Sequence, residues 1–433
     1  MPAVQSALAP GVRPVEVFAW AMFDFANSSY TTIVVTAIFG AYFVSVVAGG
    51  ADWATLAWTA ALAVSYALVM VTGPLVGAYA DLRAAKKRLL FATTLGCVLA
   101  TAALALVGRG DLALAIALIV ISNYCFGTGE NLIAAFLPEI ARGESIGRVS
   151  GWGWGLGYIG GLASLGLCLA YLHWATGRGV STEAAVPATM LITAAMFGLA
   201  SLPTFLLLKE RAKPQAGAGR VFGDTFGRLR ETLHRARRFE DLWRFLVCIA
   251  FYQAGIQTVI SLAAIYADQA MGFTTAQTLM LLAVTNVTGS VGALLFGQVQ
   301  DRLGHKLTLA LTLLLWIATV LMLWWAQGAT VFWIGANLVG LCLGASQSAG
   351  RALVGYLSPE RHAGEFFGLW GLAVKLSSIV GPLTYGLVSW LSGGDHRLAI
   401  LMTGAFFVAG LALLMSVDVG RGRDAAVSDP SGA

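Results

Sequence analysis

The sequence predicts an all-α membrane protein with twelve transmembrane helices in two six-helix pseudo-repeat bundles. Hydrophobic residues make up 58% of the 433 residues and charged residues only 11%. A soluble domain of this length cannot bury so much apolar surface around one core. Long apolar runs recur along the chain, and one polar, basic segment divides them six and six. These observations exclude a soluble globular protein.

Twelve apolar runs are long enough to cross the hydrocarbon core, which takes about 20 helical residues. The first run is too long for a signal peptide and lacks a small-residue cleavage pattern, so we expect it to be retained. The predicted spans are 16–47, 53–81, 89–108, 112–141, 146–173, 185–208, 241–270, 274–300, 307–327, 329–357, 364–391 and 397–418.

The lysines and arginines between the runs predict the orientation. With a cytoplasmic N-terminus, only Arg109, Arg178 and Arg397 lie outside. The basic loops "RAAKKR", "ARGESIGR" and "DRLGHK", the 209–244 segment and the tail then lie inside. Because positive residues favour the cytoplasmic side, we expect both termini there. The pI near 9.0 is therefore a topology signal, and we expect no nucleic-acid partner.

The chain divides into an N-terminal bundle (1–208), a basic cytoplasmic linker (209–240), a C-terminal bundle (241–418) and a cytoplasmic tail (419–433). The linker is predicted to contain a basic amphipathic helix around 220–238. Such a helix is expected to lie on anionic headgroups. Regulatory docking is the alternative.

The two halves repeat each other. "GAYADLRAAKK" (77–87) matches "GQVQDRLGHKL" (297–307), which places Asp81 on Asp301 and Lys86 on Lys306. A looser match joins "AAFLPEIARGESIGRVSG" (134–151) to "LVGYLSPERHAGEFFG" (353–368). Duplicated six-helix halves are typical of transporters that move two bundles around a central site.

The paired Gly-x-x-x-Asp-x-x-x-x-Lys loops resemble the signature of the major facilitator superfamily. In the first loop, Leu82 and Ala84 replace the usual Arg and Gly. "FDFANSSY", "AAFLPEIA" and "IGRVSGWGWGLGYIGG" further resemble the branch of the autophagy-related vacuolar amino-acid effluxer and its bacterial members, although Phe25 stands where that branch has Trp. The resemblance implies the superfamily fold, a bacterial cytoplasmic membrane, and efflux or exchange of small solutes such as amino acids.

The paired loops also supply candidate gating residues. Asp81 and Asp301 end helices at the cytoplasmic face, so each is expected to hold that face closed by capping a neighbouring helix or pairing with a cation. Asp81 is expected to hold the cytoplasmic face closed more weakly than Asp301, because its loop lacks the matching Arg and Gly. The candidate gating residues are Asp81, Lys86, Asp301, Arg302 and Lys306.

A polar stripe in the first span raises the question of its function. Asp24, Asn27, Ser28 and Thr31 occupy positions i, i+3, i+4 and i+7 and therefore share one helix face. A carboxylate near the bilayer centre costs roughly 2.5–3.5 kcal/mol on insertion scales, so it usually has a partner or a function. The alternative to a functional role is that Asp24 caps or pairs within the N-terminal bundle.

The fourth span carries a second stripe of Asn123, Gly127, Glu130 and Asn131. Glu130 and Asp24 lie at similar depth, and the family resemblance places both helices on a central cavity. Two nearby carboxylates raise at least one pKa, which suits a proton carrier. Proton coupling is thus a hypothesis.

The second half supplies amides and bases. Gln253 and Gln257 share a face of the seventh span, Gln347 and Arg351 share one of the tenth, and Lys375 lies within the eleventh. A cavity with acids on one side and bases on the other suits a zwitterion. The alternative is that Arg351 pairs with Glu130 or reaches the cytoplasmic edge, while Lys375 snorkels.

Aromatic residues complete the candidate substrate- or ion-binding set. Tyr30, Trp154 and Trp370 lie in the first, fifth and eleventh spans. A tryptophan facing a cavity binds cations through its ring, although such residues more often form walls. The glycine repeats of the fifth span, at 147, 151 and 155 and at 153, 157 and 161, are interpreted as sites of close packing.

The sequence gives no support to an enzyme. Its five histidines fall in loops or at helix ends, and no HExxH, GxSxG or GxxxxGK pattern is present. The five cysteines lack CxxC spacing, so neither metal nor cofactor is expected. We expect a monomeric secondary transporter whose partners are a small solute, protons and membrane lipid. The alternatives are an exporter of organic cations and a non-transporting membrane sensor.

Overall fold

The computed structural model describes residues 5–214, 234, 236–269, 275–326, 328–393 and 395–428. In these residues the regular structure is helical, apart from one isolated β-bridge between Leu8 and Ala141. Twelve of the helices described there are long and apolar enough to cross a membrane, which confirms the predicted number of spans. The predicted linker helix around 220–238 lies almost wholly outside the described residues.

The first six spans build one bundle. Its interior is filled by large apolar side chains such as Trp20, Phe23, Phe39 and Phe136, all of them buried. The elements are α2 (Pro14–Tyr30), η1 (Thr31–Ala37), α3 (Phe39–Tyr42), η2 (Phe43–Val47), α4 (Ala54–Arg83), α5 (Lys86–Ala103), η3 (Leu104–Leu106), α6 (Leu112–Ala134), α7 (Leu137–Ile140), η4 (Gly143–Ser145), α8 (Ile146–Thr176) and α9 (Thr182–Leu207).

The last six spans surround a second core that includes Phe245, Tyr252, Trp316 and Phe407. The chain beyond residue 418, predicted only as a tail, begins with the short helix α17. The elements are α11 (Glu240–Gln269), α12 (Thr275–Leu303), α13 (His305–Trp325), α14 (Ala329–Leu357), η5 (Glu360–His362), α15 (Ala363–Leu391), α16 (His396–Met415) and α17 (Val419–Val427).

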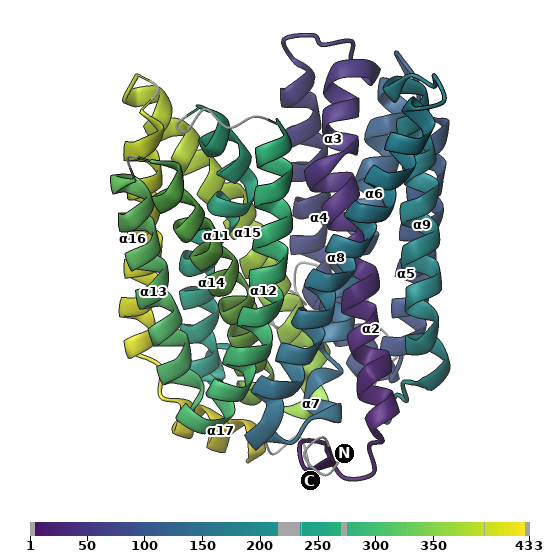
Figure 1. The fold of residues 1–433 in the computed structure, drawn as a ribbon. Coiled ribbons are helices and arrows are strands. Elements are labelled where there is room, and N and C mark those ends of the chain that lie inside the picture. The colour runs from purple at the N-terminus through teal and green to yellow at the C-terminus, as the bar shows by residue number, and fades with distance from the viewer. Residues whose placement is uncertain are drawn as a thin grey trace.

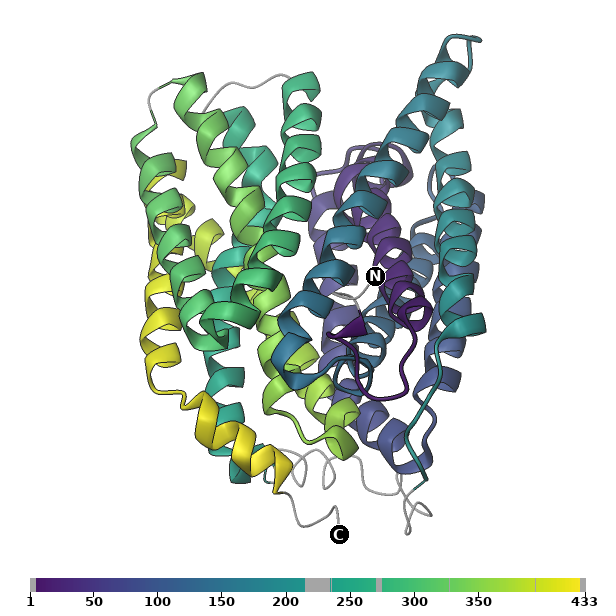
Figure 2. The same cartoon turned by 60° about the horizontal axis from the view of Figure 1, so that its bottom comes forward.

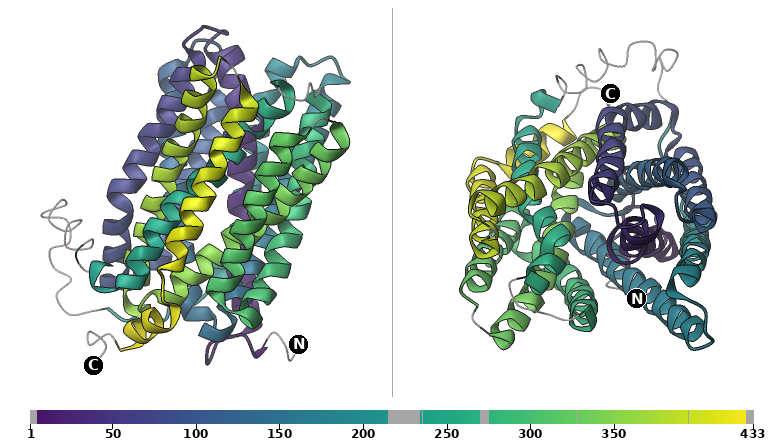
Figure 3. Two further views of the ribbon diagram at one scale, coloured as in Figure 1. Left: turned by 90° about the vertical axis from the view of Figure 1, so that its left-hand side faces the viewer. Right: turned by 90° about the horizontal axis from the view of Figure 1, so that it is seen from above.

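The two groups of helices lie side by side, with the N-terminal helices in purple to teal and the C-terminal helices in green to yellow (Figure 1; Figure 3 shows the same arrangement from above). The start of α2, the short helix α7 and the terminal helix α17 all lie at the lower end in Figure 1. We call this the basic end, because the basic loops of the sequence connect helices there.

The two halves meet at the basic end through α4 with α15 and through α8 with α12. A methyl group on Gly77 would clash with the backbone of Gly364, and one on Gly151 would clash with the backbone of Ala293. Only glycine allows this approach, in which helix backbones touch. The predicted packing role therefore holds for Gly151, which faces the opposite half.

The helix α17 lies across the basic end of the second half (Figure 2). Arg421 donates hydrogen bonds of 2.7 and 2.8 Å to the Asp241 carboxylate, and these bonds raise the pKa of Arg421 above its ordinary value. Arg423 donates to the Tyr356 carbonyl oxygen at 3.0 Å. The helix α17 is thereby joined to the end of α14 and to the start of α11.

Candidate substrate-binding site

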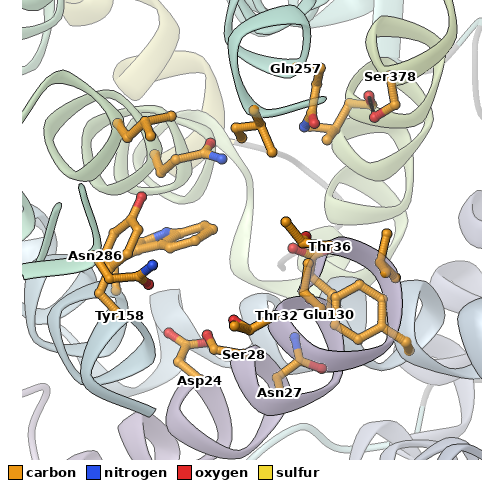
Figure 4. A pocket seen from close by; sticks show the side chains of 18 of the residues that line it. Asp24, Asn27, Ser28, Thr32, Thr36, Glu130, Tyr158, Gln257, Asn286 and Ser378 are labelled. Atoms are coloured by element: carbon orange, nitrogen blue, oxygen red, sulfur yellow. Dashed lines mark hydrogen bonds between the residues drawn. The ribbon is translucent and has the colours of Figure 1, made fainter. Parts of the chain in front are cut away.

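A cavity of about 270 Å³ lies between the two halves. Polar side chains surround it, with Asp24, Asn27 and Ser28 on one side and Gln257 and Ser378 on the other (Figure 4). Helices of both halves contribute, namely α2, η1, α4, α6 and α8 from the first and α11, α12, α14 and α15 from the second.

The polar stripe of the first span lines this cavity as a unit. Asp24, Asn27, Ser28 and Thr31 are all lining residues. Beyond them the helix widens into the π-helix η1, whose Thr32 and Thr36 also line the cavity. The sequence there, "TTIVVT", is a run of β-branched residues that crowd an α-helical turn, and π-helical turns occur frequently at functional sites.

Asp24 pairs with a base of the opposite half. The Nη1 atom of Arg351 lies 2.7 Å from the Asp24 Oδ2 atom, and both side chains are buried. The pairing crosses from α2 to α14, so the alternatives of a partner within the N-terminal bundle for Asp24 and of Glu130 for Arg351 are wrong.

Arg351 is fixed by several further contacts. It donates to the Ser150 hydroxyl at 3.2 Å and to the Ser150 carbonyl oxygen at 2.9 Å. Its guanidinium lies 4.8 Å from the ring centroid of Trp20 and 5.2 Å from that of Trp154. These contacts use most of the guanidinium donors and leave few for a solute.

Glu130 forms a second ion pair between the halves. The Lys375 ammonium nitrogen lies 3.2 Å from the Glu130 Oε2 atom, which joins α6 to α15. The same nitrogen lies over the rings of Tyr66 and Phe126 at 5.5 and 5.6 Å. The Glu130 side chain is 21% exposed, so this pair is open to the cavity. Lys375 therefore does not snorkel to a membrane surface.

The remaining predicted binding residues divide into two groups. Asn123, Trp154, Gln257, Gln347 and Trp370 line the cavity. Gln347 also accepts a hydrogen bond from the Gln253 amide at 2.6 Å. The structure places Tyr30, Asn131 and Gln253 behind the cavity wall, because they are buried and are not lining residues.

Two of these buried residues have clear packing partners. The Tyr30 hydroxyl lies 2.8 Å from the Ser122 hydroxyl, and its ring stacks on Phe126. The Asn131 amide lies between Gly73 and Gly371, so it fills a notch where α4 and α15 meet. Both residues therefore support the cavity wall from behind.

At the basic end, Asp81 caps the first turn of α15. It accepts hydrogen bonds from the backbone N–H groups of Gly364 and Glu365 at 3.1 and 2.9 Å. Lys86 lies 3.1 Å from Asp81 and 2.8 Å from Glu139. The carboxylate of one half thus holds the helix terminus of the other.

Asp301 holds the start of α8 in the corresponding way. It accepts from the Arg148 backbone N–H at 3.2 Å, and the Arg148 guanidinium lies 3.4 Å from it. Lys306 instead donates to the carbonyl oxygens of Met415 and Val417, and Arg302 is exposed. Asp81 finds its partners in Lys86 and the α15 terminus, and its weaker hold relative to Asp301 stays a prediction.

The family model described as "Vacuole effluxer Atg22 like" matches residues 53–427. The chain belongs to this family. It is a major facilitator superfamily transporter of the Atg22-like branch.

Relatives occur in bacteria and fungi. The uncharacterized MFS-type transporter YxiO of Bacillus subtilis is 29% identical over 406 residues, which cover 92% of this chain and 94% of YxiO. Autophagy-related protein 22-1 of Aspergillus fumigatus is 25% identical over 343 residues, which cover 71% and 55% of the two chains. The Atg22-like chain thus spans about half the length of the fungal relatives it matches.

Solved structures share the fold of this Atg22-like transporter. The human organic anion transporter MFSD10 has a TM-score of 0.74 at 16% identity and covers 92% of this chain and 99% of its own. The fucose:proton symporter of E. coli has a TM-score of 0.70 at 16% identity, with coverages of 93% and 98%. These likenesses confirm the predicted major facilitator fold.

Several lining residues of the Atg22-like cavity were not predicted. Thr32, Thr36, Tyr66, Tyr158 and Asn286 line it. Asn286 is an isolated amide within an apolar helix, which is a recognisable signal of a functional position in a membrane span. Tyr66 and Tyr158 carry no such signal, because aromatic residues are common throughout the spans.

Proposed function

We propose that this Atg22-like protein is a secondary active transporter for a small zwitterion, with an amino acid as the first candidate. The observation that carries the proposal is the Glu130–Lys375 pair, which brings an anion and a cation from opposite halves together in one cavity. A zwitterion matches this pair, with its ammonium group on Glu130 and its carboxylate on Lys375.

The proposal assigns different roles to the two ion pairs. A zwitterion that enters between Glu130 and Lys375 replaces one internal ion pair by two pairs to the solute, so no charge is left unpaired. Besides Asp24, Arg351 already contacts Ser150 and two tryptophan rings. We therefore place the solute at Glu130 and Lys375 and assign the other pair to the closed interface.

The proposed transport cycle is alternating access across the bacterial cytoplasmic membrane, with the basic end cytoplasmic. The contacts of Asp81 and Asp301 between the halves support a state that is closed at the basic end. Efflux requires that both aspartates release their helices so that the cavity opens inward.

Proton coupling through Glu130 is part of the proposal. Glu130 is the more exposed of the two cavity carboxylates, so it is the better placed to exchange a proton. Glu130→Gln is expected to abolish uptake driven by a pH gradient, while equilibrium exchange continues at saturating solute with a raised KM, because exchange needs no net change in protonation but the solute ammonium group loses its counter-charge. Loss of both activities, or of neither, would remove this role.

An exporter of organic cations is the second candidate. Tyr66 and Phe126 already lie against the Lys375 ammonium group, and Trp154 and Tyr158 add further rings to the wall. A ligand cation that displaces Lys375 would find the same aromatic faces. A membrane sensor that transports nothing is the alternative from another class.

Substrate counterflow in proteoliposomes tests the proposal. Proteoliposomes that contain the purified protein are loaded with an unlabelled solute, and the uptake of the same labelled solute is measured. The solutes screened are amino acids, sugars and organic cations. We expect counterflow for amino acids, and no counterflow in liposomes without protein. Counterflow of organic cations alone would favour the exporter, and no counterflow of any solute would favour the sensor.

A further inference from the structure

The residues that follow α9, which begin the predicted linker, are fixed to the first half at the basic end. Glu210 accepts hydrogen bonds from the backbone N–H groups of Lys86 and Lys87 at 2.6 and 3.2 Å. These residues open α5, and the first N–H groups of a helix have no partner within it. Ala85, at the N-cap position of α5, has no side chain that could cap them. The linker therefore supplies the cap of α5 from a distant part of the chain.

The capped residue Lys86 also belongs to the contacts that join the two halves. Its buried ammonium group lies 3.1 Å from Asp81. Asp81 in turn accepts from two backbone N–H groups at the start of α15, in the opposite half. The linker thus holds the backbone of Lys86, while the side chain of Lys86 contacts the carboxylate that holds α15. Lys86 alone separates Glu210 from that carboxylate.

The turn that joins Asp81 to Lys86 has a strained backbone. Ala84 has a φ of 49°, and it is the one non-glycine residue with a positive φ in the described part of the chain. A Cβ atom disfavours this left-handed conformation, which persists only where surrounding contacts hold it. The matching position of the second loop is Gly304, whose φ of 88° carries no such cost. Glu210 supplies a holding contact directly after the strained turn.

A second linker residue reinforces the position of Lys86. Glu139, from the motif "AAFLPEIA", accepts from the Lys86 ammonium group at 2.8 Å and from the Arg211 backbone N–H at 3.3 Å. The Arg211 guanidinium donates to the buried Glu16 of α2 at 2.8 Å. Lys86 is therefore held at its backbone by Glu210 and at its ammonium group by Glu139, and the linker contacts both points.

We propose that Glu210 is a positioning residue for the gate at the basic end, and that docking of the linker start on α5 keeps this end closed. Glu210 fixes the strained turn, the turn places Lys86 against Asp81, and Asp81 holds α15. Undocking of Glu210 lets the turn relax and weakens the hold on α15, so the linker regulates opening of the cavity toward the basic end. This inference rests on the proposed gating role of Asp81.

Labelling of a cysteine introduced at Ser378, which lines the cavity, measures this opening in reconstituted full-length protein. An impermeant reagent is added on the side of the basic end. Glu210→Ala is expected to raise the labelling rate about fivefold, because it removes a helix cap. Glu240→Ala is the matched control, since this exposed acid at the start of α11 pairs with Arg244, and it should leave the rate unchanged.

The same assay separates this inference from the proposed gate. An unchanged rate in Glu210→Ala, together with a raised rate in Asp81→Asn, would overturn the inference alone. If neither variant raises the rate, the gating role of Asp81 fails and the inference falls with it.

Two double variants distinguish positioning from general stabilisation of the bundle. Glu210→Ala with Asp81→Asn should label no faster than Asp81→Asn alone, because both changes act on the same contact. Glu210→Ala with Ala84→Gly should return toward the wild-type rate, because glycine adopts the turn without strain. Additive effects of Glu210→Ala and Asp81→Asn would overturn the proposal, as would a lowered melting temperature in Glu210→Ala with no recovery of the labelling rate by Ala84→Gly.

Discussion

Two ion pairs connect the halves of this protein within one cavity, and they differ in how firmly they are held. Arg351 contacts Asp24 at 2.7 Å and has Ser150 and two tryptophan rings as further partners. Lys375 also lies over two aromatic rings, but it contacts Glu130 at 3.2 Å through a single hydrogen bond, and Glu130 is partly exposed. We therefore expect the first pair to stay closed and the second to open to a solute.

This difference shows that a charged residue within a membrane span is not by itself evidence of a contact with the substrate. Asp24 and Glu130 carry the same charge, and the sequence predicts a similar depth in the membrane for both. What separates the two ion pairs is the number of hydrogen bonds that the base donates, three for Arg351, counting the one to Asp24, and one for Lys375, because each existing bond must be broken before a solute can bind. The comparison can be challenged by removing one member of each pair.

Asp24→Asn is expected to have the largest effect on stability. The change leaves the Arg351 charge buried without a counter-charge, which costs about 3–5 kcal/mol when a buried pair is broken. The melting temperature of purified protein measures this loss. The double change Asp24→Asn with Arg351→Met is the control and should recover most of the stability. An unchanged melting temperature in Asp24→Asn would contradict the structural role.

Asp81→Asn and Asp301→Asn are expected to shift the protein toward opening at the basic end. Each removes a charged acceptor that holds the helix terminus of the other half, worth about 1.5–3 kcal/mol per bond to a charged group. Asp81 should have the larger effect, since it accepts from two backbone N–H groups of the other half. Cysteine accessibility from the two sides of the membrane measures the shift.

Equal accessibility in parent and variants would contradict the gating role of both aspartates. A larger effect at Asp301 would restore the order predicted from the loop sequences. Arg302→Gln is a matched control, because this exposed residue lies beside Asp301 and should change accessibility little.

Tyr30→Phe is expected to have the smallest effect. It removes one buried hydrogen bond, to Ser122, which costs about 0.5–1.5 kcal/mol. Transport affinity should be unchanged, because Tyr30 lies behind the cavity wall. Stability and KM measured on the same preparation separate the two effects. A raised KM with normal stability would instead show that Tyr30 is part of the substrate-binding site.

Much of the fold could be predicted from the sequence, because apolar run length directly reports membrane span. The expected spans 329–357 and 364–391 agree with α14 and α15 to within one residue at each end. The helix α17 was missed, since its nine residues are too short and too polar for that criterion. Its position depends on tertiary contacts such as that of Arg421 with Asp241.

For the site, helical periodicity predicted which residues share a face, and the stripe of Asp24, Asn27 and Ser28 does line the cavity. Periodicity could not predict partners across the halves, because these depend on how the two bundles are rotated. It therefore did not join Asp24 to Arg351 or Glu130 to Lys375. The widening at Thr31–Ala37 was also missed, since a fixed period of 3.6 residues assumes a regular helix.

The central claim is that a solute carboxylate binds Lys375 when the Glu130–Lys375 pair opens. The most direct measurement compares the affinity of Lys375→Ala for a carboxylate-bearing substrate and for its decarboxylated amine, with Lys375→Arg as the charge-preserving control. We predict that Lys375→Ala weakens binding of the carboxylate-bearing substrate by about 1.5–3 kcal/mol, roughly 10- to 150-fold, and leaves binding of the amine nearly unchanged. Unchanged affinity for both ligands, or an equal loss for both, would contradict the account.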